Sequence, residues 1–575
     1  MKEKNKDHFW ITMLGILLFI PFLGSVHLFD WDEINFAESA REMLLTGNWG
    51  TVQINFETFW EKPPFFFWLQ ALSMSLFGVN EFAARLPNAI AGILTLNFIW
   101  YIGKTHFKKE LAMWWVLGFL ASLTPHLYFR SGIIDPVFNL LVFTSIYQLF
   151  LSSIEKSVSM RRALLFGLFL GLAVLTKGPV AILLVGLVFV SVLIWTKKIW
   201  FNYRHFIFAL LATVTPVLLW LTPQLIANGP AFLSEFIQYQ IDLLTKPVAS
   251  HGQPWFYHPI ILLIGCFPIS ILSIPELYNT NSKHNFDPWM KSLFWVVLIV
   301  FSVVTTKIVH YSSLCYLPLT FLFARFMLRE KSNVRGRGIL VFSTGLIGIL
   351  LLALIFGIIW IGNNTGEFLS RFGSKIKDSF ALANLSAPNE WGGYEYLLLF
   401  LLLIAIVLMF LGILRWNKRL IGVSLLLNTL FVSSLMTVVV PRIEAYTQKS
   451  IIEFYESIQE EECYVHTYKF KSYAHYFYSQ TNPLKAQDDL FMIRSDYFES
   501  HGVSSIVELT SDDKITLNDK IFSYLVEGEL DKNVYIICQE KKREDLLAKN
   551  ELKEILAQGG FYVFQRKANI NSRID

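Results

Sequence analysis

The sequence FWITMLGILLFIPFLGSVHLFDWDE, residues 9–33, decides the fold class. Its first part is an apolar run long enough to cross a hydrocarbon core of roughly 30 Å as a helix that rises about 1.5 Å per residue. The basic stretch before it, Met1 to Lys6, is typical of a signal peptide, but no small-residue cleavage pattern follows before Asp30. We therefore predict that this run remains in the protein as a membrane anchor.

Apolar runs of similar length recur along the chain as far as Val440. Of the 575 residues, 54% are hydrophobic and 16% are charged, whereas soluble domains usually carry about 25% charged residues. About thirteen runs reach the roughly 17 to 25 residues that a membrane span needs. The sequence therefore predicts a polytopic α-helical membrane protein with about thirteen transmembrane helices.

The positive charges between these runs predict the orientation of the chain. If the N-terminus is cytoplasmic, most of the connecting lysines and arginines fall in inner loops, as the positive-inside rule requires. They include Lys104, Lys108, Lys109, Arg161, Arg162, Lys197, Lys198, Arg204, Lys283, Lys291 and the basic residues of 325–337 and 415–419. An odd number of spans then places the chain after Pro441 outside.

The segment 441–575 is more polar than the rest and contains no further spanning run. We predict a transmembrane domain over 1–440 and a small extracytoplasmic α/β domain over 441–575. The predicted strands are Cys463–Tyr468, Leu490–Ile493, Ser504–Leu509, Val534–Cys538 and Phe561–Phe564, and Glu540–Leu556 is a predicted helix. A disulfide between Cys463 and Cys538 is permitted outside the cytoplasm, and the sequence leaves it open.

The first outer loop, 29–87, begins with three carboxylates, those of Asp30, Asp32 and Glu33. Plotted at about 100° per residue, the stretch 36–44 separates into an apolar arc and a polar arc, which predicts an amphipathic helix lying in the membrane interface. A carboxylate at the start of such a helix also caps free amides, so Asp32 taken alone has a structural explanation.

Other charged groups occur in outer loops, where the positive-inside rule does not call for them. They are Glu61 and Lys62 ahead of Pro63-Pro64, Asp135 before Pro136, Lys177 in the turn 175–179, and Lys307, His310 and Tyr311 on one outer turn. Most of them also fit an ordinary explanation, such as a snorkelling lysine, a helix N-cap or a histidine that satisfies a neighbour, but an interfacial aromatic belt explains Glu61 poorly. Together they predict a polar cavity, in which lysines suit a phosphate and an ionised aspartate suits a hydroxyl or amine that must lose a proton.

The same loops bear on metals and on other classes of function. Asp30, Asp32, Glu61 and His310 offer ligands for a divalent metal, but their spacing matches no closed site, so a metal stays open. The net charge of +4 gives no indication of a nucleic-acid partner. A nucleotide-driven pump is disfavoured because the sequence has neither a P-loop nor a dinucleotide-binding glycine pattern.

Several short motifs resemble those of a known family. They are Asp32-Glu33, Ala37-Glu38, Arg41-Glu42-Met43, Glu61-Lys62-Pro63-Pro64, Phe82-Ala83-Ala84-Arg85-Leu86-Pro87 and Lys177-Gly178-Pro179. With them the chain resembles the C-type glycosyltransferases, and most of all the bacterial branch of the protein-mannosyltransferase-like superfamily, which includes the aminoarabinose transferase that modifies lipid A. The resemblance covers residues 9–440 and is strongest before Pro179.

This resemblance implies a glycosyltransferase of the bacterial inner membrane. It would move a sugar from a polyprenyl-phosphate donor to a lipid A-like lipid or a protein on the periplasmic face. Asp32 would be the catalytic carboxylate with Asp135 as a second acidic group, while Lys62 and Lys177 would hold the carrier phosphate. The cavity would be lined by Glu33, Asn35, Phe59, Glu61, Lys307, His310 and Tyr311. We expect inversion, because no separate acid and nucleophile pair is seen.

Two departures from the family pattern leave the sugar open. Asn35 stands where the aminoarabinose transferases have arginine, and Phe59 precedes Trp60 where they have tyrosine. A transporter or flippase of a lipid-linked anion is the main alternative, although it would place its charges midway across the bilayer. A structural or assembly protein is a third reading. The acceptor, the carrier length, the oligomeric state and the role of the C-terminal domain also stay open.

Overall fold

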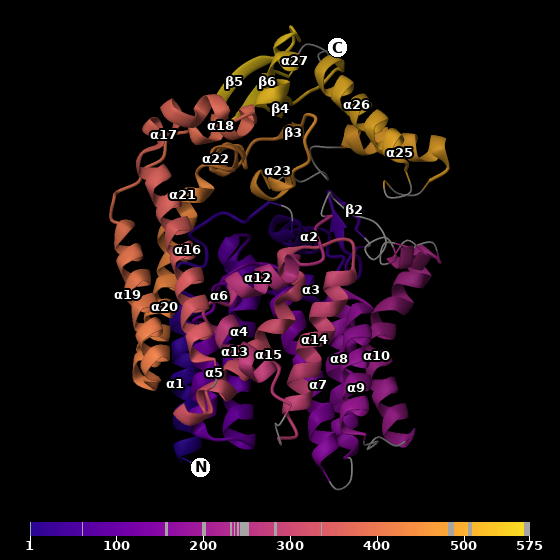
Figure 1. The fold of residues 1–575 in the computed structure, drawn as a ribbon. Helices are drawn as coiled ribbons and strands as arrows, with labels where there is room; N and C mark the ends of the chain where they lie inside the picture. The colour runs from indigo at the N-terminus through magenta and orange to yellow at the C-terminus, as the bar shows by residue number, and fades with distance from the viewer. Residues whose placement is uncertain are drawn as a thin grey trace.

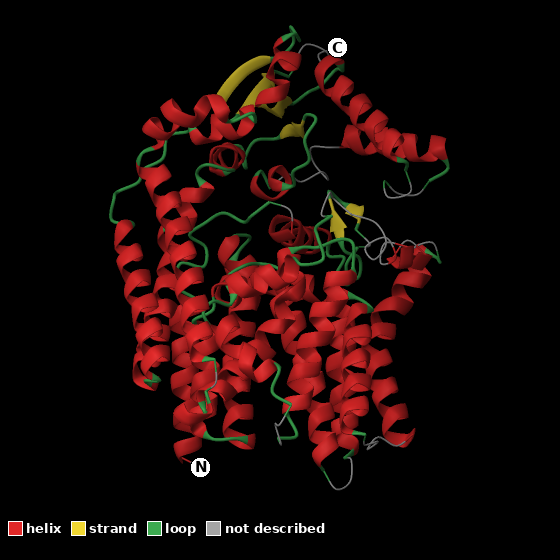
Figure 2. Cartoon of the chain, viewed as in Figure 1, coloured by secondary structure: helices red, strands yellow, loops and turns green. Residues whose placement is uncertain are grey.

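The computed structural model describes residues 2–568 apart from 31, 60, 156–158, 198–202, 231–232, 235, 239–240, 242–251, 281–283, 335, 481–487, 504–505 and 507–508. The described chain is mostly helical, with a four-stranded sheet and a two-stranded hairpin (Figure 2). Trp31, Trp60, Lys198 and Lys283, which belong to predicted motifs or inner loops, lie outside the described residues, as does most of the predicted strand 504–509.

The first 440 residues form a body of helices (Figure 1). They are α1 (Lys2–Phe19), α2 (Asp32–Thr46), α3 (Phe65–Phe77), α4 (Glu81–His106), α5 (Lys109–Leu120), α6 (Leu123–Tyr128), α7 (Asp135–Ile154), α8 (Met160–Lys177), α9 (Val180–Thr196), α10 (Tyr203–Asn228), α12 (Tyr257–Gly265), α13 (Ile269–Leu277), α14 (Asp287–Val303), α15 (Tyr316–Met327), α16 (Arg337–Asn363), α17 (Thr365–Phe372), α18 (Ser379–Leu385), α19 (Tyr396–Arg415) and α20 (Lys418–Val438). Three 3-10 helices, η2 (Val309–Cys315), η3 (Lys331–Asn333) and η4 (Gly373–Lys375), and the hairpin β1 (Gln53–Ile54) and β2 (Glu57–Thr58) complete this part.

Among the described residues, six helices are long and apolar enough to cross a membrane: α4, α7, α10, α16, α19 and α20. The bent pair α12 and α13, whose axes differ by 118°, would make a seventh span. Several other predicted runs form helices shorter than a typical span, such as the 12 residues of α5. A multi-span helical fold is therefore observed, while the count of about thirteen spans stays a prediction.

Two of the long helices lie at the periphery of the body. Only 17% of the apolar window of α10 and 22% of that of α16 is buried inside the protein. Their exposed side chains are leucine, isoleucine and phenylalanine, such as Leu219, Ile339 and Phe342. Since water would disfavour such surfaces, these faces suit contact with lipid.

Helix α2 forms where the sequence predicts a helix, but its polar face is not left to solvent. Glu38 and Arg41 form a buried two-contact ion pair at 2.7 Å, and Glu42 accepts the backbone N–H groups of Asn55 and Phe56 at 2.5 and 2.9 Å. The polar arc of α2 is thus buried within the protein, where the helix contacts the hairpin and α23 of the C-terminal part, and its place in the membrane interface stays a prediction.

Beyond the helical body lies the C-terminal part (Figure 1). It contains α21 (Val440–Glu444), α22 (Lys449–Ser457), β3 (Cys463–Thr467), α23 (Ala474–Tyr478), α25 (Asp488–His501), α26 (Ser511–Glu527), β4 (Asn533–Gln539), the 3-10 helix η5 (Glu540–Lys542), α27 (Arg543–Leu547), β5 (Lys553–Gln558) and β6 (Phe561–Arg566). The strand order is β3-β4-β6-β5, with β3 parallel to β4 and the other pairs antiparallel. The tight β5–β6 turn uses Gly559 and Gly560, both at positive φ, a conformation that favours glycine.

Three of the predicted strands, those at β3, β4 and β6, are confirmed. The prediction for Leu490–Ile493 is wrong, because these residues lie in α25, and four apolar residues cannot distinguish a helix from a strand. The predicted helix Glu540–Leu556 ends at Leu547, and β5 then begins at Lys553. Charged residues are common on an edge strand such as β5, so its sequence resembles that of a surface helix.

The four cysteines are buried and unpaired. In the register of the parallel strands, Cys463 is paired with Asn533 and Cys538 lies five residues further along β4. At about 3.3 Å per residue, this offset places the two thiols too far apart for a disulfide.

Candidate active site

A cavity of about 580 Å³ lies between the start of α2, the loop before α3, the turn before α7, the end of α8 and the residues around η2. Two residues of the C-terminal part, Lys471 and Tyr473, also line it. The lining residues are Phe29, Asp30, Asp32, Glu33, Asn35, Phe36, Phe59, Glu61, Lys62, Leu127, Tyr128, Ser131, Ile133, Ile134, Asp135, Lys177, Thr306, Ile308, His310, Tyr311, Lys471 and Tyr473.

The structure brings together almost the whole predicted set. Both predicted catalytic aspartates and both predicted phosphate-binding lysines line this one cavity, although they come from four separate stretches of the chain. Lys307 is the exception and does not line it: its side chain is buried and its Nζ donates to the carbonyl oxygen of Val304 at 2.7 Å. Its cation therefore anchors the end of α14 instead of facing the cavity.

His310 lies between the two aspartates. Its Nε2 is 3.6 Å from Oδ2 of Asp32 and 3.6 Å from Oδ2 of Asp135. Burial lowers the pKa of His310, an effect that the two carboxylates oppose and the Lys177 and Lys62 cations reinforce. The net lowering of the His310 pKa favours the neutral imidazole between the two carboxylates.

Asp135 and Lys177 form an ion pair in the cavity wall. Nζ of Lys177 is 2.6 Å from Oδ1 of Asp135 and lies 4.8 Å from the centre of the Tyr311 ring. Asp135 begins α7, but no side-chain cap is made there, so its carboxylate serves the cavity and not the helix end. Lys177 ends α8, where the negative end of the helix dipole favours a cation, and Gly178 at a φ of 83° turns the chain away.

Lys62 reaches the same group of charges from the loop before α3. Burial lowers the pKa of Lys62 below the ordinary 10.5, although the carboxylates of Glu61 and Asp32 act in the opposite direction. The neighbouring Lys177 lowers it further. Two lysines close enough to disfavour each other's charge form a site that an anion would stabilise.

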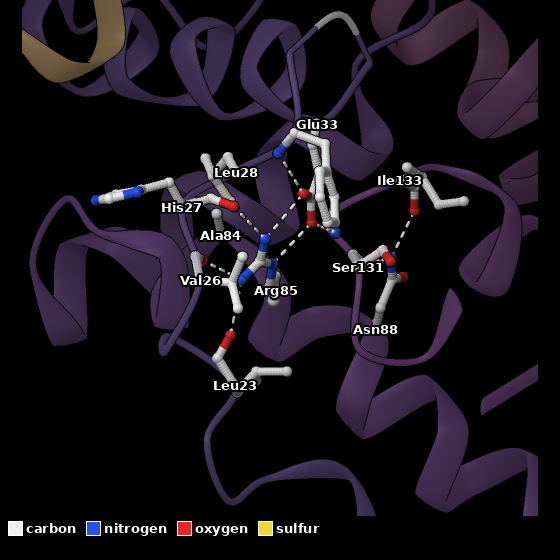
Figure 3. Close-up of polar contacts among 12 residues, drawn as sticks. Leu23, Val26, His27, Leu28, Glu33, Ala84, Arg85, Asn88, Ser131 and Ile133 are labelled. Atoms are coloured by element: carbon white, nitrogen blue, oxygen red, sulfur yellow. Dashed lines mark hydrogen bonds and ion pairs between the residues drawn. The ribbon is translucent and has the colours of Figure 1, made fainter. Parts of the chain in front are cut away.

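Glu33 lines the cavity wall, but its carboxylate is already engaged (Figure 3). It accepts hydrogen bonds from Nε and Nη2 of Arg85 at 2.8 and 2.9 Å. It also accepts hydrogen bonds from the backbone N–H groups of Phe29 and Gly132 at 2.8 and 2.5 Å. Arg85 also donates to the carbonyl oxygens of Leu23, Val26 and His27. Glu33 is therefore a structural residue of the wall.

The same helix, α4, fixes the turn that carries Asp135. Asn88, one turn after Arg85 on α4, donates hydrogen bonds from its Nδ2 to the carbonyl oxygens of Ser131 and Ile133 at 2.6 and 2.5 Å (Figure 3). The Arg85–Glu33 pair and Asn88 thus tie the exit of the first predicted span to the residues just before α7.

Among the lining residues that the sequence does not predict, Lys471 and Tyr473 come from the C-terminal part. They lie between β3 and α23, more than 400 positions after Asp32, and they reach the cavity because the C-terminal part packs on α2. The backbone N–H of Tyr473 donates to Oδ1 of Asp30 at 3.3 Å, and Gln448 Oε1 accepts the N–H of Asp30 at 3.3 Å. No local motif marks these positions.

The predicted metal ligands do not form a compact set. A metal site needs at least three ligand atoms close together. Within the described chain, His27, Glu81 and Glu456 form the one group of histidine, cysteine or acidic residues whose ligand atoms all lie within 4.8 Å of one another. None of these three residues lines the cavity. Asp30, Asp32, Glu61 and His310 do not converge in this way, so the geometry does not favour a closed metal site there.

The chain is similar to known proteins in sequence and in fold. Residues 61–220, which contain Lys62, Asp135 and Lys177, match the model of the dolichyl-phosphate-mannose-protein mannosyltransferase family. The chain is 27% identical to an undecaprenyl phosphate-alpha-4-amino-4-deoxy-L-arabinose arabinosyl transferase of Wigglesworthia glossinidia brevipalpis over 58% of its own length and 60% of that protein's. It is 29% identical to the enzyme of the same name from Aeromonas salmonicida, over 60% and 65%.

The predicted resemblance to this glycosyltransferase family is confirmed.

The likeness in fold extends further than the likeness in sequence. ArnT from Cupriavidus metallidurans, in a crystal structure with bound undecaprenyl phosphate, superposes with a TM-score of 0.74 over 98% of this chain and 99% of that one. The identity is 18%, so this match concerns the fold. In sequence, the chain matches 60% and 62% of the length of the first two curated relatives.

Proposed function

We propose that the chain is an integral-membrane glycosyltransferase that moves a sugar from a polyprenyl-phosphate donor to a lipid A-like lipid or a protein on the periplasmic face. The observation that carries this proposal is the cavity in which Asp32, Asp135 and His310 meet Lys62 and Lys177. Relatives whose names specify an undecaprenyl phosphate-linked sugar support the donor class.

The lysines would stabilise the leaving group. A departing polyprenyl phosphate keeps its negative charge, and Lys62 and Lys177 line the same cavity, where both cations can stabilise it. Fixed positive charges aimed at the place where negative charge develops lower such a barrier more than general-acid protonation would. In this proposal, Asp135 holds Lys177 in position through the 2.6 Å contact.

Asp32 would act on the acceptor. The acceptor oxygen attacks the anomeric carbon, and its proton passes to the Asp32 carboxylate. A new carbon–oxygen bond to the acceptor forms while the carbon–oxygen bond to the phosphate breaks, and polyprenyl phosphate departs with the bonding electrons. One displacement from the opposite face gives inversion, and neutral His310 would orient the two aspartates.

We also propose the topology that the charge pattern predicts. It has about thirteen spans across a bacterial inner membrane, a cytoplasmic N-terminus, and domains at 1–440 and 441–575. The start of α1 and the sheet β3–β6 lie at opposite ends of the molecule, which supports placing them on opposite faces (Figure 1). In this arrangement, the cavity opens on the side of the C-terminal part.

The proposal is tested by incubating the purified protein with polyprenyl phosphates that carry different sugars, together with envelope lipid extract. Mass spectrometry would follow the release of free polyprenyl phosphate and the sugar gained by the acceptor. Release with matching transfer is the expected result. A folded protein that binds lipid-linked sugars but moves them intact across proteoliposomes, without release, would instead indicate a transporter.

Lys62→Ala is expected to weaken the binding of polyprenyl phosphate by roughly ten- to a hundredfold, because a buried charge-assisted contact contributes about 1.5–3 kcal/mol. Binding can be measured by titrating the lipid into protein in detergent. In the wild type, affinity should fall as pH rises through the lowered pKa of Lys62, at a lower pH than for an ordinary lysine.

Lys307→Ala is the matched control for that titration, since Lys307 is a buried lysine near the cavity that does not line it. It should leave the phosphate affinity and its pH dependence unchanged. Equal losses in the two variants would remove Lys62 from the phosphate site.

A further inference from the structure

The backbone just before Asp32 is held by residues from the other end of the chain. The N–H of Leu28 donates to Oη of Tyr478 at 2.6 Å, and the carbonyl oxygen of Leu28 accepts a hydrogen bond from Nε2 of Gln448 at 2.7 Å. The N–H of Asp30 donates to Oε1 of the same Gln448 at 3.3 Å. Because a carboxamide both donates and accepts, this one side chain satisfies two backbone groups ahead of Asp32.

The residue between these two contacts is held from within the helical body. The N–H of Phe29 donates to Oε2 of Glu33 at 2.8 Å, and the carbonyl oxygen of Phe29 accepts the N–H of Ile34 at 3.3 Å. The backbone groups of Leu28 and Asp30 therefore bond to the C-terminal part, and those of Phe29 bond to α2. The path of the chain into Asp32 is fixed from both sides.

Asp32 depends on this stretch for its position. It is the first residue of α2, and the first turn of a helix has N–H groups without partners inside the helix, so helix ends fray. The Asp32 side chain is 41% exposed, so packing does not lock it in place. A catalytic group has to stay within roughly 0.5 Å of its productive position, and here the preceding backbone sets that position.

The elements that carry Gln448 and Tyr478 pack onto α2. Gln448 directly precedes α22, Tyr478 is the last residue of α23, and α23 contacts both α22 and α2. Both short helices lie between the helical body and the four-stranded sheet (Figure 1). Tyr478 is only 2% exposed. The two helices thus form a firm support on the outer side of the backbone that leads to Asp32.

We infer that Gln448 is a positioning residue, which holds the backbone at Leu28 and Asp30 so that the Asp32 carboxylate meets the acceptor. This inference rests on the proposed function and on the role of Asp32 in it. Gln448 is not among the residues that line the cavity, so it acts through Asp32 and not on the substrate. A displacement of about 1 Å at a reacting group can lower a rate about a hundredfold.

The first test uses Gln448→Met in the full-length protein, because methionine keeps a long unbranched side chain but makes neither hydrogen bond. The rate of polyprenyl phosphate release at saturating donor should fall by about ten- to a hundredfold. The affinity for bare polyprenyl phosphate should stay within about twofold of the wild type, since Lys62 and Lys177 are untouched.

A double-mutant cycle with Asp32→Asn separates positioning from general support of the fold. If Gln448 acts through Asp32, adding Gln448→Met to Asp32→Asn should lower the residual rate by no more than about twofold, because the carboxylate that it positions is gone. A residue that merely supported the fold would lower the rate by the same factor in both backgrounds.

Tyr478→Phe removes the hydroxyl to which the Leu28 N–H donates and keeps the buried ring. It should show the same pattern in the cycle with a smaller loss of rate, so the inference stays testable if Gln448→Met folds poorly. Gln565→Met is the matched control, because Gln565 is also a half-buried glutamine of the C-terminal part and its Nε2 donates to Oη of Tyr535 in the sheet, at 3.2 Å. It should change neither the rate nor the affinity.

A wild-type rate in Gln448→Met would overturn this inference and leave the proposed function intact. Equal losses of rate with and without the Asp32 carboxylate would overturn it as well, and so would a loss of phosphate affinity that matches the loss of rate. A wild type that releases no polyprenyl phosphate from any sugar-bearing lipid would instead overturn the proposed function, whatever the Gln448 variants do.

Discussion

Asp32→Asn is expected to lower glycosyl transfer by about a hundred- to ten-thousandfold, the range for removal of a positioned general base. Asparagine has nearly the same shape but cannot accept the proton of the attacking acceptor. The Asp32 side chain is 41% exposed, and its Oδ2 lies 3.6 Å from Nε2 of His310. The fold should therefore survive the change, and polyprenyl phosphate should still bind at Lys62 and Lys177.

The measurement is the initial rate of polyprenyl phosphate release, with donor affinity and thermal stability recorded on the same preparation. A variant that keeps near-normal turnover would show that Asp32 is not the base. Loss of donor affinity in parallel with rate would instead indicate that Asp32 contributes to binding, and the assignment of the proton transfer would then have to change.

Glu33→Gln, one residue further along, is expected to have the opposite profile. The carboxylate of Glu33 accepts four hydrogen bonds from Arg85, Phe29 and Gly132, and both Glu33 and Arg85 are almost wholly buried. Glutamine would point an NH2 group at these donors and leave the guanidinium without a counter-charge. Breaking a buried ion pair by removing one partner costs about 3–5 kcal/mol.

Thermal unfolding of the detergent-solubilised protein, followed by tryptophan fluorescence, checks this prediction. Glu33→Gln should unfold at a clearly lower temperature than wild type, and Asp32→Asn should not. Activity may be compared only at temperatures where the variant is folded. If Glu33→Gln were as stable as the wild type yet inactive, Glu33 would belong to the chemistry and not to the wall.

The sequence was sufficient to predict the groups at the centre of the cavity. Asp32, Lys62 and Lys177 carry charge in predicted outer loops where the positive-inside rule does not explain it, and each is followed by a local feature, a helix start or a proline turn, that fixes its direction. Such signals are local, so they can be interpreted without knowing which loops meet.

What could not be predicted depends on contacts between distant segments. Lys307 is as close in sequence to His310 as Lys62 is to Phe59, yet its side chain turns away to the Val304 carbonyl. The polar arc of α2 suggested contact with water, because nothing local shows that the chain returns some 400 residues later to cover it. Tyr473 and Lys471 were missed for the same reason.

The contacts of Asp30 with Gln448 and Tyr473 also fix a sequence of events during synthesis. A ribosome adds residues in order, so the early charges are made and inserted long before these late partners exist. A chain cut short before Gln448 would contain Asp32, Lys62 and Lys177 but lack one wall around them. The cavity therefore gains its last wall only when residues 448–473 have been made, and if the proposed function holds, shorter chains should release no polyprenyl phosphate.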